Sequence, residues 1–99
     1  MSALDDLFAE EYERLKRMQS AMERELDRLP KGYLSKKNIG GKQYYYFQCR
    51  NGSKIVSSYV APSVVKDYEA KIARRKQLEA SVRECKANII RLEKVMKHG

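Results

Sequence analysis

The amino-acid sequence predicts an α+β fold: a long N-terminal helix, a three-stranded antiparallel β-meander and a long C-terminal helix. Residues 3–29 and 63–97 carry apolar residues at spacings of three and four, which is the helical period. Residues 32–60 alternate as strands do and contain two glycine turns. We expect the helices to pack as an antiparallel coiled-coil hairpin. A chain of 99 residues is then a single domain, residues 1–99.

The first helix is predicted over residues 3–29. Ser2 can cap it, and acidic residues in the first turn suit the helix dipole. Pro30 and Gly32 are expected to end it. A continuous apolar seam, expected to be core, contains Leu4, Leu7, Phe8, Tyr12, Leu15, Met18, Met22, Leu26 and Leu29.

Two turns define the strands, which we expect at residues 33–39, 42–50 and 53–60. Gly40-Gly41 predicts a type I′ turn, because both central positions of that turn need positive φ. Asn51-Gly52 is the strongest hairpin signal in the chain and predicts the second turn.

These turns fix the strand pairing. Leu34 should face Phe47, Phe47 should face Val56, and Tyr44 should face Tyr59. Alternation then predicts a core face with Leu34, Tyr45, Phe47, Cys49, Val56 and Val60. The opposite face is aromatic, polar and basic, and it holds Tyr33, Lys37, Ile39, Tyr44, Tyr46, Gln48, Arg50, Ile55 and Tyr59.

The second helix is predicted over residues 63–97, with Pro62 before its first turn. Its apolar seam changes phase across Arg74-Arg75-Lys76, where no apolar residue continues the stripe. The seam contains Val65, Tyr68, Ile72, Leu78, Val82, Cys85, Ile89, Leu92 and Met96. A seam this narrow also allows a second copy to pack, so a homodimer stays open.

The net charge of +8 indicates polyanionic partners, such as nucleic acid, a nucleotide or an acidic protein. Residues 30–63 contain six Lys and Arg residues and no carboxylate. Cys49 and Cys85 form no CxxC motif, and the acidic start lacks the apolar segment of a signal peptide. We therefore expect a cytoplasmic protein. No apolar run approaches the roughly 18 residues of a membrane span, so no membrane partner is expected.

Several short motifs carry a family resemblance. They are Leu29-Pro30-Lys31-Gly32, Lys37-x-Ile39-x-Gly41-Lys42-x-Tyr44-Tyr45-Tyr46, Arg50-x-Gly52-x-Lys54 and Ser58-Tyr59-Val60, followed by a charged helix. Residues 29–96 thereby resemble a family of small uncharacterised bacterial and phage proteins, which implies the fold and no activity. The hairpin is similar, more weakly, to the arm-type DNA-binding sheet of tyrosine recombinases. That resemblance implies binding alone, since the chain has no recombinase catalytic domain.

Tyrosines on a basic sheet can stack on bases while lysines hold phosphates. The candidate nucleic-acid-binding residues are Tyr33, Lys36, Lys37, Lys42, Tyr44, Tyr46, Arg50, Lys54, Tyr59, Arg74, Arg75 and Lys76. The alternative is structural. Tyrosines also pack across sheets, lysines beside a glycine turn also make an ordinary hairpin tip, and a basic helix face can pair with Glu10, Glu11 or Glu13.

Catalysis is not predicted. His98 is the chain's one histidine, and no metal-ligand spacing, phosphate loop or nucleophile motif is present. We expect no enzyme activity, no metal and no cofactor.

The leading hypothesis is a non-enzymatic module that binds nucleic acid or a nucleotide. A second is a phage- or mobile-element-encoded inhibitor of a bacterial defence system, either an anti-CRISPR protein or a nucleotide sponge. It would act on a nucleic-acid-handling protein or signal. A third is a coiled-coil oligomerisation unit that the sheet only caps.

Overall fold

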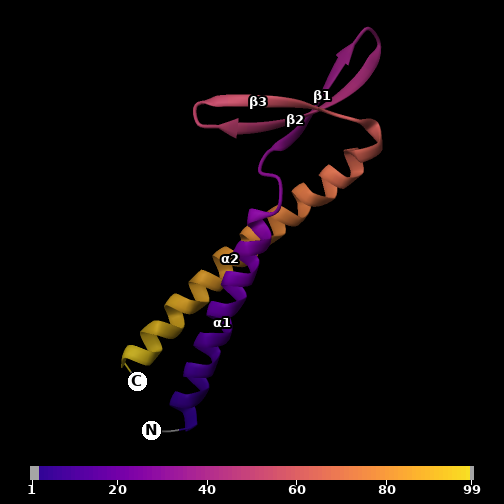
Figure 1. Ribbon diagram of the computed structural model, residues 1–99. Helices are drawn as coiled ribbons and strands as arrows, with labels where there is room; N and C mark the ends of the chain where they lie inside the picture. The colour runs from indigo at the N-terminus through magenta and orange to yellow at the C-terminus, as the bar shows by residue number, and fades with distance from the viewer. Residues whose placement is uncertain (1–2, 99) are drawn as a thin grey trace. The chain divides into compact units, whose positions relative to one another are not determined.

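The computed structural model describes residues 3–98 and confirms the α+β fold (Figure 1). Ser2, the predicted helix cap, lies outside the described residues. The elements in order are α1 (Ala3–Asp27), β1 (Tyr33–Ile39), β2 (Lys42–Asn51), β3 (Lys54–Val60), the 3₁₀ turn η1 (Pro62–Val64) and α2 (Val65–His98). Each predicted element is present, with ends that differ by up to two residues.

The chain falls into two compact units. The helical unit contains the residues up to Arg28 and those from Gln77 onward. The sheet unit is Leu29–Lys76, so it holds the three strands and the first part of α2. That the two units together form a single domain stays a prediction.

Helix α1 ends at Asp27, two residues before the predicted end. The amide of Arg28 donates to the Glu25 carbonyl at 3.0 Å, which closes the last turn with a tighter i to i+3 bond. Leu29 precedes Pro30, and the proline ring disfavours helical dihedrals at the residue before it. Leu29 therefore lies outside α1 and does not continue its apolar seam.

Inside the helical unit, α1 and the C-terminal part of α2 lie side by side and run in opposite directions (Figure 1). Leu15, Cys85 and Ile89 form a buried cluster. Tyr12, Met22 and Leu92 pack against this cluster. The thiol of Cys85 donates to the Leu15 carbonyl at 3.2 Å, so this buried cysteine also links the two helices. Coiled-coil packing of the pair stays a prediction.

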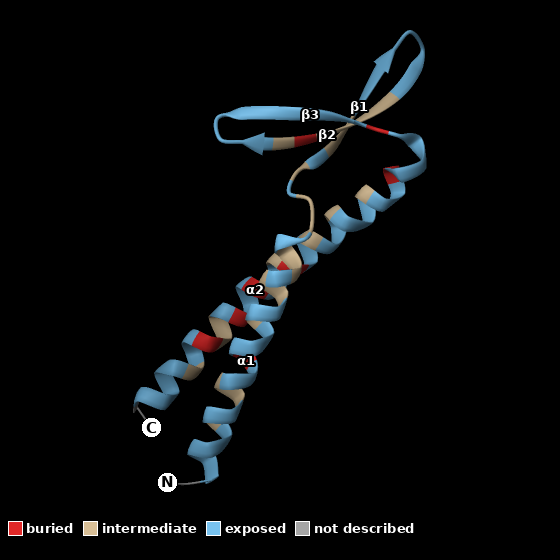
Figure 2. Ribbon diagram, in the orientation of Figure 1, coloured by how far each residue is buried: buried red, intermediate tan, exposed pale blue. Residues whose placement is uncertain are grey.

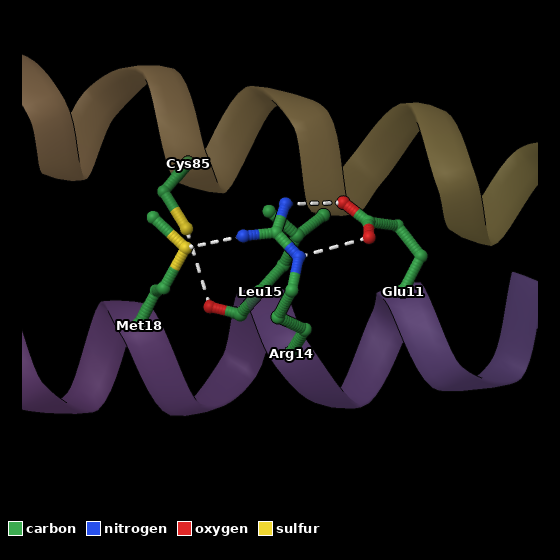
Figure 3. A network of polar contacts seen from close by, with 5 residues as sticks. All are labelled: Glu11, Arg14, Leu15, Met18 and Cys85. Carbon is green, nitrogen blue, oxygen red and sulfur yellow. Dashed lines mark hydrogen bonds and ion pairs between the residues drawn. The ribbon is translucent and has the colours of Figure 1, made fainter.

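A polar network lies beside this cluster (Figure 3). The guanidinium of Arg14 donates from Nε to Glu11 at 2.9 Å and from Nη1 to the sulfur of Met18 at 3.0 Å. The hydrogen bond and the charge of Arg14 lower the pKa of Glu11, and Glu11 in turn raises the pKa of Arg14. Both groups are solvent-exposed, and such surface pairs contribute little to stability.

The prediction that the whole apolar seam is core is wrong toward the ends of the helices and at Met18, inside α1. Leu4 and Leu7 are 58% and 59% exposed, and Met18 and Met96 are also exposed. Each helix has one neighbouring helix in this unit. One neighbour covers the centre of an apolar stripe and leaves its flanks and ends in water.

The three strands form an antiparallel meander in the order β1-β2-β3. The first hairpin has the predicted register, with Leu34 opposite Phe47 and Lys37 opposite Tyr44. Gly40 and Gly41 have φ of 59° and 81°, as a type I′ turn requires.

The predicted register of the second hairpin is wrong by two residues. Asn51 pairs with Lys54, so the loop is Gly52-Ser53, and Tyr59 lies opposite Tyr46 where Tyr44 was expected. Gly52 has φ of 65°, and no other described residue of this turn has positive φ. Glycine at the first loop position is the requirement of a type II′ turn. Because the shift is an even number, every side chain stays on its predicted face.

One sheet face packs against α2 within the sheet unit. The rings of Phe47 and Tyr68 have centroids 5.2 Å apart, and Val60 is 2% exposed. Val56 belongs to the same face but is 46% exposed, so its predicted core position is wrong. It lies on β3 near the Gly52 turn, on the part of the hairpin that α2 leaves uncovered.

Candidate nucleic-acid interface

The opposite side of the sheet, here called the tyrosine face, holds every second residue of each strand. By register it contains Tyr33, Ser35, Lys37, Ile39, Lys42, Tyr44, Tyr46, Gln48, Arg50, Ile55, Ser57 and Tyr59. Seven of the twelve predicted binding residues thus share one face. The register brings them together because both hairpin loops contain two residues.

Three tyrosines form a ring cluster on this face. The Tyr46 and Tyr59 rings meet edge to face with centroids 6.0 Å apart, and Tyr44 lies 6.4 Å from Tyr59 at a tilt of 55°. Tyr59 is 56% exposed, whereas Tyr44 and Tyr46 are half-buried. The cluster therefore offers a fixed aromatic surface with one ring well open to solvent.

Lysines lie over tyrosine rings on both faces of the sheet. The Nζ of Lys37 is 4.8 Å from the Tyr46 centroid on the tyrosine face. The Nζ of Lys36 is 5.5 Å from the Tyr45 centroid on the opposite face. Both distances suit a cation–π contact, which holds each ammonium near an aromatic surface.

The remaining cations of the sheet divide between the two faces. Lys42 and Arg50 are exposed on the tyrosine face, at the two ends of β2. Lys54 is exposed on the opposite face with Lys36, so these two predicted residues do not lie beside the tyrosine cluster.

Tyr33 shares the tyrosine face by register but has a different environment. It is 57% exposed and lines a shallow groove against α2. The other residues of the groove are Leu34, Glu69, Ile72, Ala73 and Lys76. Tyr33 and Lys76 therefore adjoin this groove, apart from the three contacting rings.

Gln48 is a buried polar residue on the tyrosine face, at 9% exposure, that sequence reasoning did not single out. Its amide Nε2 donates to the hydroxyl of Ser35 at 2.9 Å, which joins β1 to β2 below the exposed side chains. The sequence does contain a signal for this bond. Gln48 lies in the middle strand, and the register places Ser35 of the neighbouring strand two positions away from it.

The basic run in α2 does not act as one group. Arg75 is half-buried, and its Nη1 donates to the Leu29 carbonyl at 3.0 Å. It thus satisfies a backbone acceptor just after α1 and fixes the segment that leads into β1. Arg74 is exposed on the helix surface, and Lys76 is exposed beside the groove with Tyr33.

Positive charge is concentrated in the sheet unit. Residues 29–76 hold eleven Lys and Arg residues and two carboxylates, a formal charge of +9. The remaining residues hold ten Lys and Arg and eleven Asp and Glu, a charge of −1. The whole net charge of +8 therefore belongs to the unit that carries the tyrosine cluster.

Among residues 3–98, no group of three or more His, Cys, Asp and Glu side chains is arranged to hold a metal ion. None of the helices in this span combines the length and apolarity that a membrane crossing requires.

Comparison with known proteins places the chain in a family. No curated protein and no solved structure is significantly similar to the chain. A family profile described as a domain of unknown function, DUF6788, matches residues 9–70. This range begins inside α1 and ends in the first turns of α2, whereas the resemblance noted in the sequence covers residues 29–96. Because the profile covers more than half of the chain, including all three strands, this protein belongs to the DUF6788 family.

Proposed function

We propose that this protein is a non-enzymatic module that binds single-stranded nucleic acid on its tyrosine face. The observation that carries the proposal is the contacting cluster of Tyr44, Tyr46 and Tyr59 on a sheet without a single carboxylate. Aromatic stacking platforms beside cations are the recurring means of binding single strands. Tyrosine packing alone accounts for the rings but gives no reason for the missing acids.

Each part of the cluster has a distinct role in this proposal. Tyr59 is the most exposed of the three rings and offers its face to a base. Tyr44 and Tyr46 hold that ring in position through tilted and edge-on contacts. Lys37 rests on the Tyr46 ring, from which its ammonium can move to a phosphate beside a stacked base.

The spread of charge favours a polymer over a mononucleotide. Ten cations are distributed over both sheet faces and the first part of α2, which exceeds what one nucleotide can contact. A single strand also fits better than a duplex, because its bases are free to stack on rings. Backbone phosphates would then follow Lys37, Lys42 and Arg50.

A direct binding experiment tests this proposal. A fluorescently labelled single-stranded oligonucleotide is titrated with the protein at low salt, and anisotropy is recorded. We expect saturable binding that an unlabelled single strand displaces better than a duplex or a mononucleotide does. Absence of any binding at low salt would refute the proposal.

The biological setting is part of the same proposal. We place the protein in the cytoplasm, since both of its cysteines are free thiols, as a reducing compartment maintains them. A phage or mobile-element origin would follow from the family resemblance in the sequence.

An inhibitor of a defence system would instead capture one host protein in a pull-down that nuclease treatment leaves unchanged.

A further inference from the structure

Strand β3 forms a free edge of the sheet, because the strand order is β1-β2-β3. Its residues from Lys54 to Tyr59 are all exposed (Figure 2). An edge strand presents unpaired backbone N–H and C=O groups that can pair with another strand. β3 therefore offers a seven-residue template to a partner.

The two edges of the sheet differ in how they are protected. β1 carries Lys36 and Lys37 at its centre, and central lysines are a common means of preventing edge pairing. In β3 the one charged residue is Lys54, next to the turn. The rest of β3 consists of β-branched residues, serines and one tyrosine, which suit a strand interior.

The hairpin register shows which backbone groups of β3 face outward. In a two-residue turn the closing pair, here Asn51 and Lys54, exchanges backbone hydrogen bonds. Antiparallel pairs alternate between bonded and non-bonded. The N–H and C=O groups of Ile55, Ser57 and Tyr59 therefore point away from β2.

We propose that β3 pairs antiparallel with β3 of a second copy about a two-fold axis at Ser57. Ser57 then lies opposite the partner's Ser57. The outward backbone N–H and C=O groups of the two serines pair with each other. Ile55 lies opposite the partner's Tyr59, and the reverse pair forms by symmetry. These side chains are 58% and 56% exposed in one copy, and β-branched and aromatic residues are favourable cross-strand partners.

Charge favours this register over shifted ones. The three strands carry five cations, but only Lys54 lies on the pairing strand. With the axis at Ser57, the two Lys54 residues are six positions apart along the strands, about 20 Å at the usual rise. That separation exceeds the screening length of about 8 Å at physiological salt. A register shifted toward the turn would bring the two lysines together.

The pairing stops at two copies. It uses the β3 edge of both copies and leaves the lysine-bearing β1 strands as the outer edges of a six-stranded sheet. Ile55, Ser57 and Tyr59 all belong to the tyrosine face, so the two tyrosine faces become one continuous surface. The dimer is independent of nucleic acid, and its test contains none.

Light scattering after size-exclusion chromatography tests the pairing. The buffer contains enough salt to screen the repulsion between the positively charged sheet units of two copies. We expect a mass of twice the 11.6 kDa of one chain. Ser57→Pro removes an outward-facing N–H, and an edge strand tolerates proline there, so this variant should have the mass of one chain. Asn38→Pro is the matched control, because Asn38 faces outward on β1 by the same alternation, and it should stay dimeric.

A second measurement does not depend on how proline is tolerated. Ser57→Cys, in a Cys49→Ser background, is treated with a short bifunctional thiol reagent. We expect rapid cross-linking between chains, and none from the background variant or from Asn38→Cys in that background. A single-chain mass at high concentration, or a dimer that Ser57→Pro leaves intact and Ser57→Cys does not cross-link, would overturn the proposal.

Discussion

The ring of Tyr59 meets the ring of Tyr46 edge to face across the β2–β3 pair, with centroids 6.0 Å apart. The two residues lie directly opposite each other in the register. This contact holds the most exposed ring of the cluster in one orientation. A preordered ring loses less freedom when a base stacks on it, which is why the cluster suits a binding surface.

Replacing Tyr59 tests the stacking part of the account. Tyr59→Ala removes the exposed ring, and loss of one base stack should weaken oligonucleotide binding roughly 5- to 150-fold, since such a stack contributes about 1–3 kcal/mol. Tyr59→Phe keeps the ring and should keep most of the affinity. Fluorescence anisotropy measures both.

Tyr44→Ala separates stacking from any effect at the β3 edge, because Tyr44 is on the middle strand. Tyr44→Ala should also weaken oligonucleotide binding, but the protein should keep the dimer mass that light scattering measures. Equal binding by Tyr59→Ala and the unsubstituted chain would show that the rings only support the sheet.

Lys37 and Lys16 form a matched pair for testing phosphate contact. Both hold their ammonium near a tyrosine ring, Lys37 at 4.8 Å from Tyr46 and Lys16 at 5.7 Å from Tyr12. Lys37 lies on the tyrosine face, whereas Lys16 lies in the helical unit. Lys37→Ala should weaken binding and reduce the slope of log affinity against log salt by about 0.7, the value for one phosphate contact with a single strand.

Lys16→Ala should leave both the affinity and the salt slope unchanged. The measurement is a set of anisotropy titrations at several salt concentrations. Equal effects of the two substitutions would indicate that net charge alone drives binding.

Gly32→Ala tests the close packing below the sheet. A Cβ atom at residue 32 would lie 2.2 Å from the Gln48 carbonyl oxygen and 2.6 Å from the Cζ of Phe47. The backbone oxygen cannot move far, so the substitution should cost about 1–3 kcal/mol of unfolding free energy, as overpacking does. Urea denaturation followed by circular dichroism measures this.

Gly40→Asn is the control for that substitution. Gly40 has open space around it, and asparagine tolerates positive φ better than most residues do. The urea concentration at which half of the Gly40→Asn variant is unfolded should therefore change little. A Gly32→Ala variant as stable as the unsubstituted chain would mean that β1 enters the sheet differently.

The core of the helical unit is tested by two leucines of α1. Leu15 is 6% exposed beside Cys85, whereas Leu7 is 59% exposed. Leu15→Ala should cost roughly 2–5 kcal/mol, the usual range for a buried leucine. Leu7→Ala should change stability by less than about 0.5 kcal/mol. Similar losses from the two changes would contradict the arrangement of the helix pair.

Local signals in the sequence predicted much of the fold. Gly40-Gly41 allows one two-residue turn, so the first hairpin register follows from the chain alone. The Asn51-Gly52-Ser53 stretch fits two turns, because Asn-Gly suits type I′ and Gly-Ser suits type II′. The choice between them depends on which strand pairs fit across the finished sheet, and the sequence carries no local signal for that.

Contacts between distant positions were beyond sequence reasoning. Arg75 was grouped with its basic neighbours, but its bond to the Leu29 carbonyl joins residues 46 positions apart. The burial of Gln48 depends on how the strands and the Gly32 segment pack around it. Membership of the tyrosine face needed only alternation, which is why that face was predicted correctly while the environment of Tyr33 was not.

Binding of single strands on the tyrosine face is tested most directly by an NMR titration of this 11.6 kDa chain with a single-stranded oligonucleotide at low salt. If single strands bind on the tyrosine face, ring resonances of Tyr44, Tyr46 and Tyr59 and amides near Lys37 will shift together with one saturation curve. Tyr12, in the helical unit, should stay unperturbed, and added salt should reverse the shifts. Shifts confined to the helices, or none at any salt concentration, would contradict binding on this face.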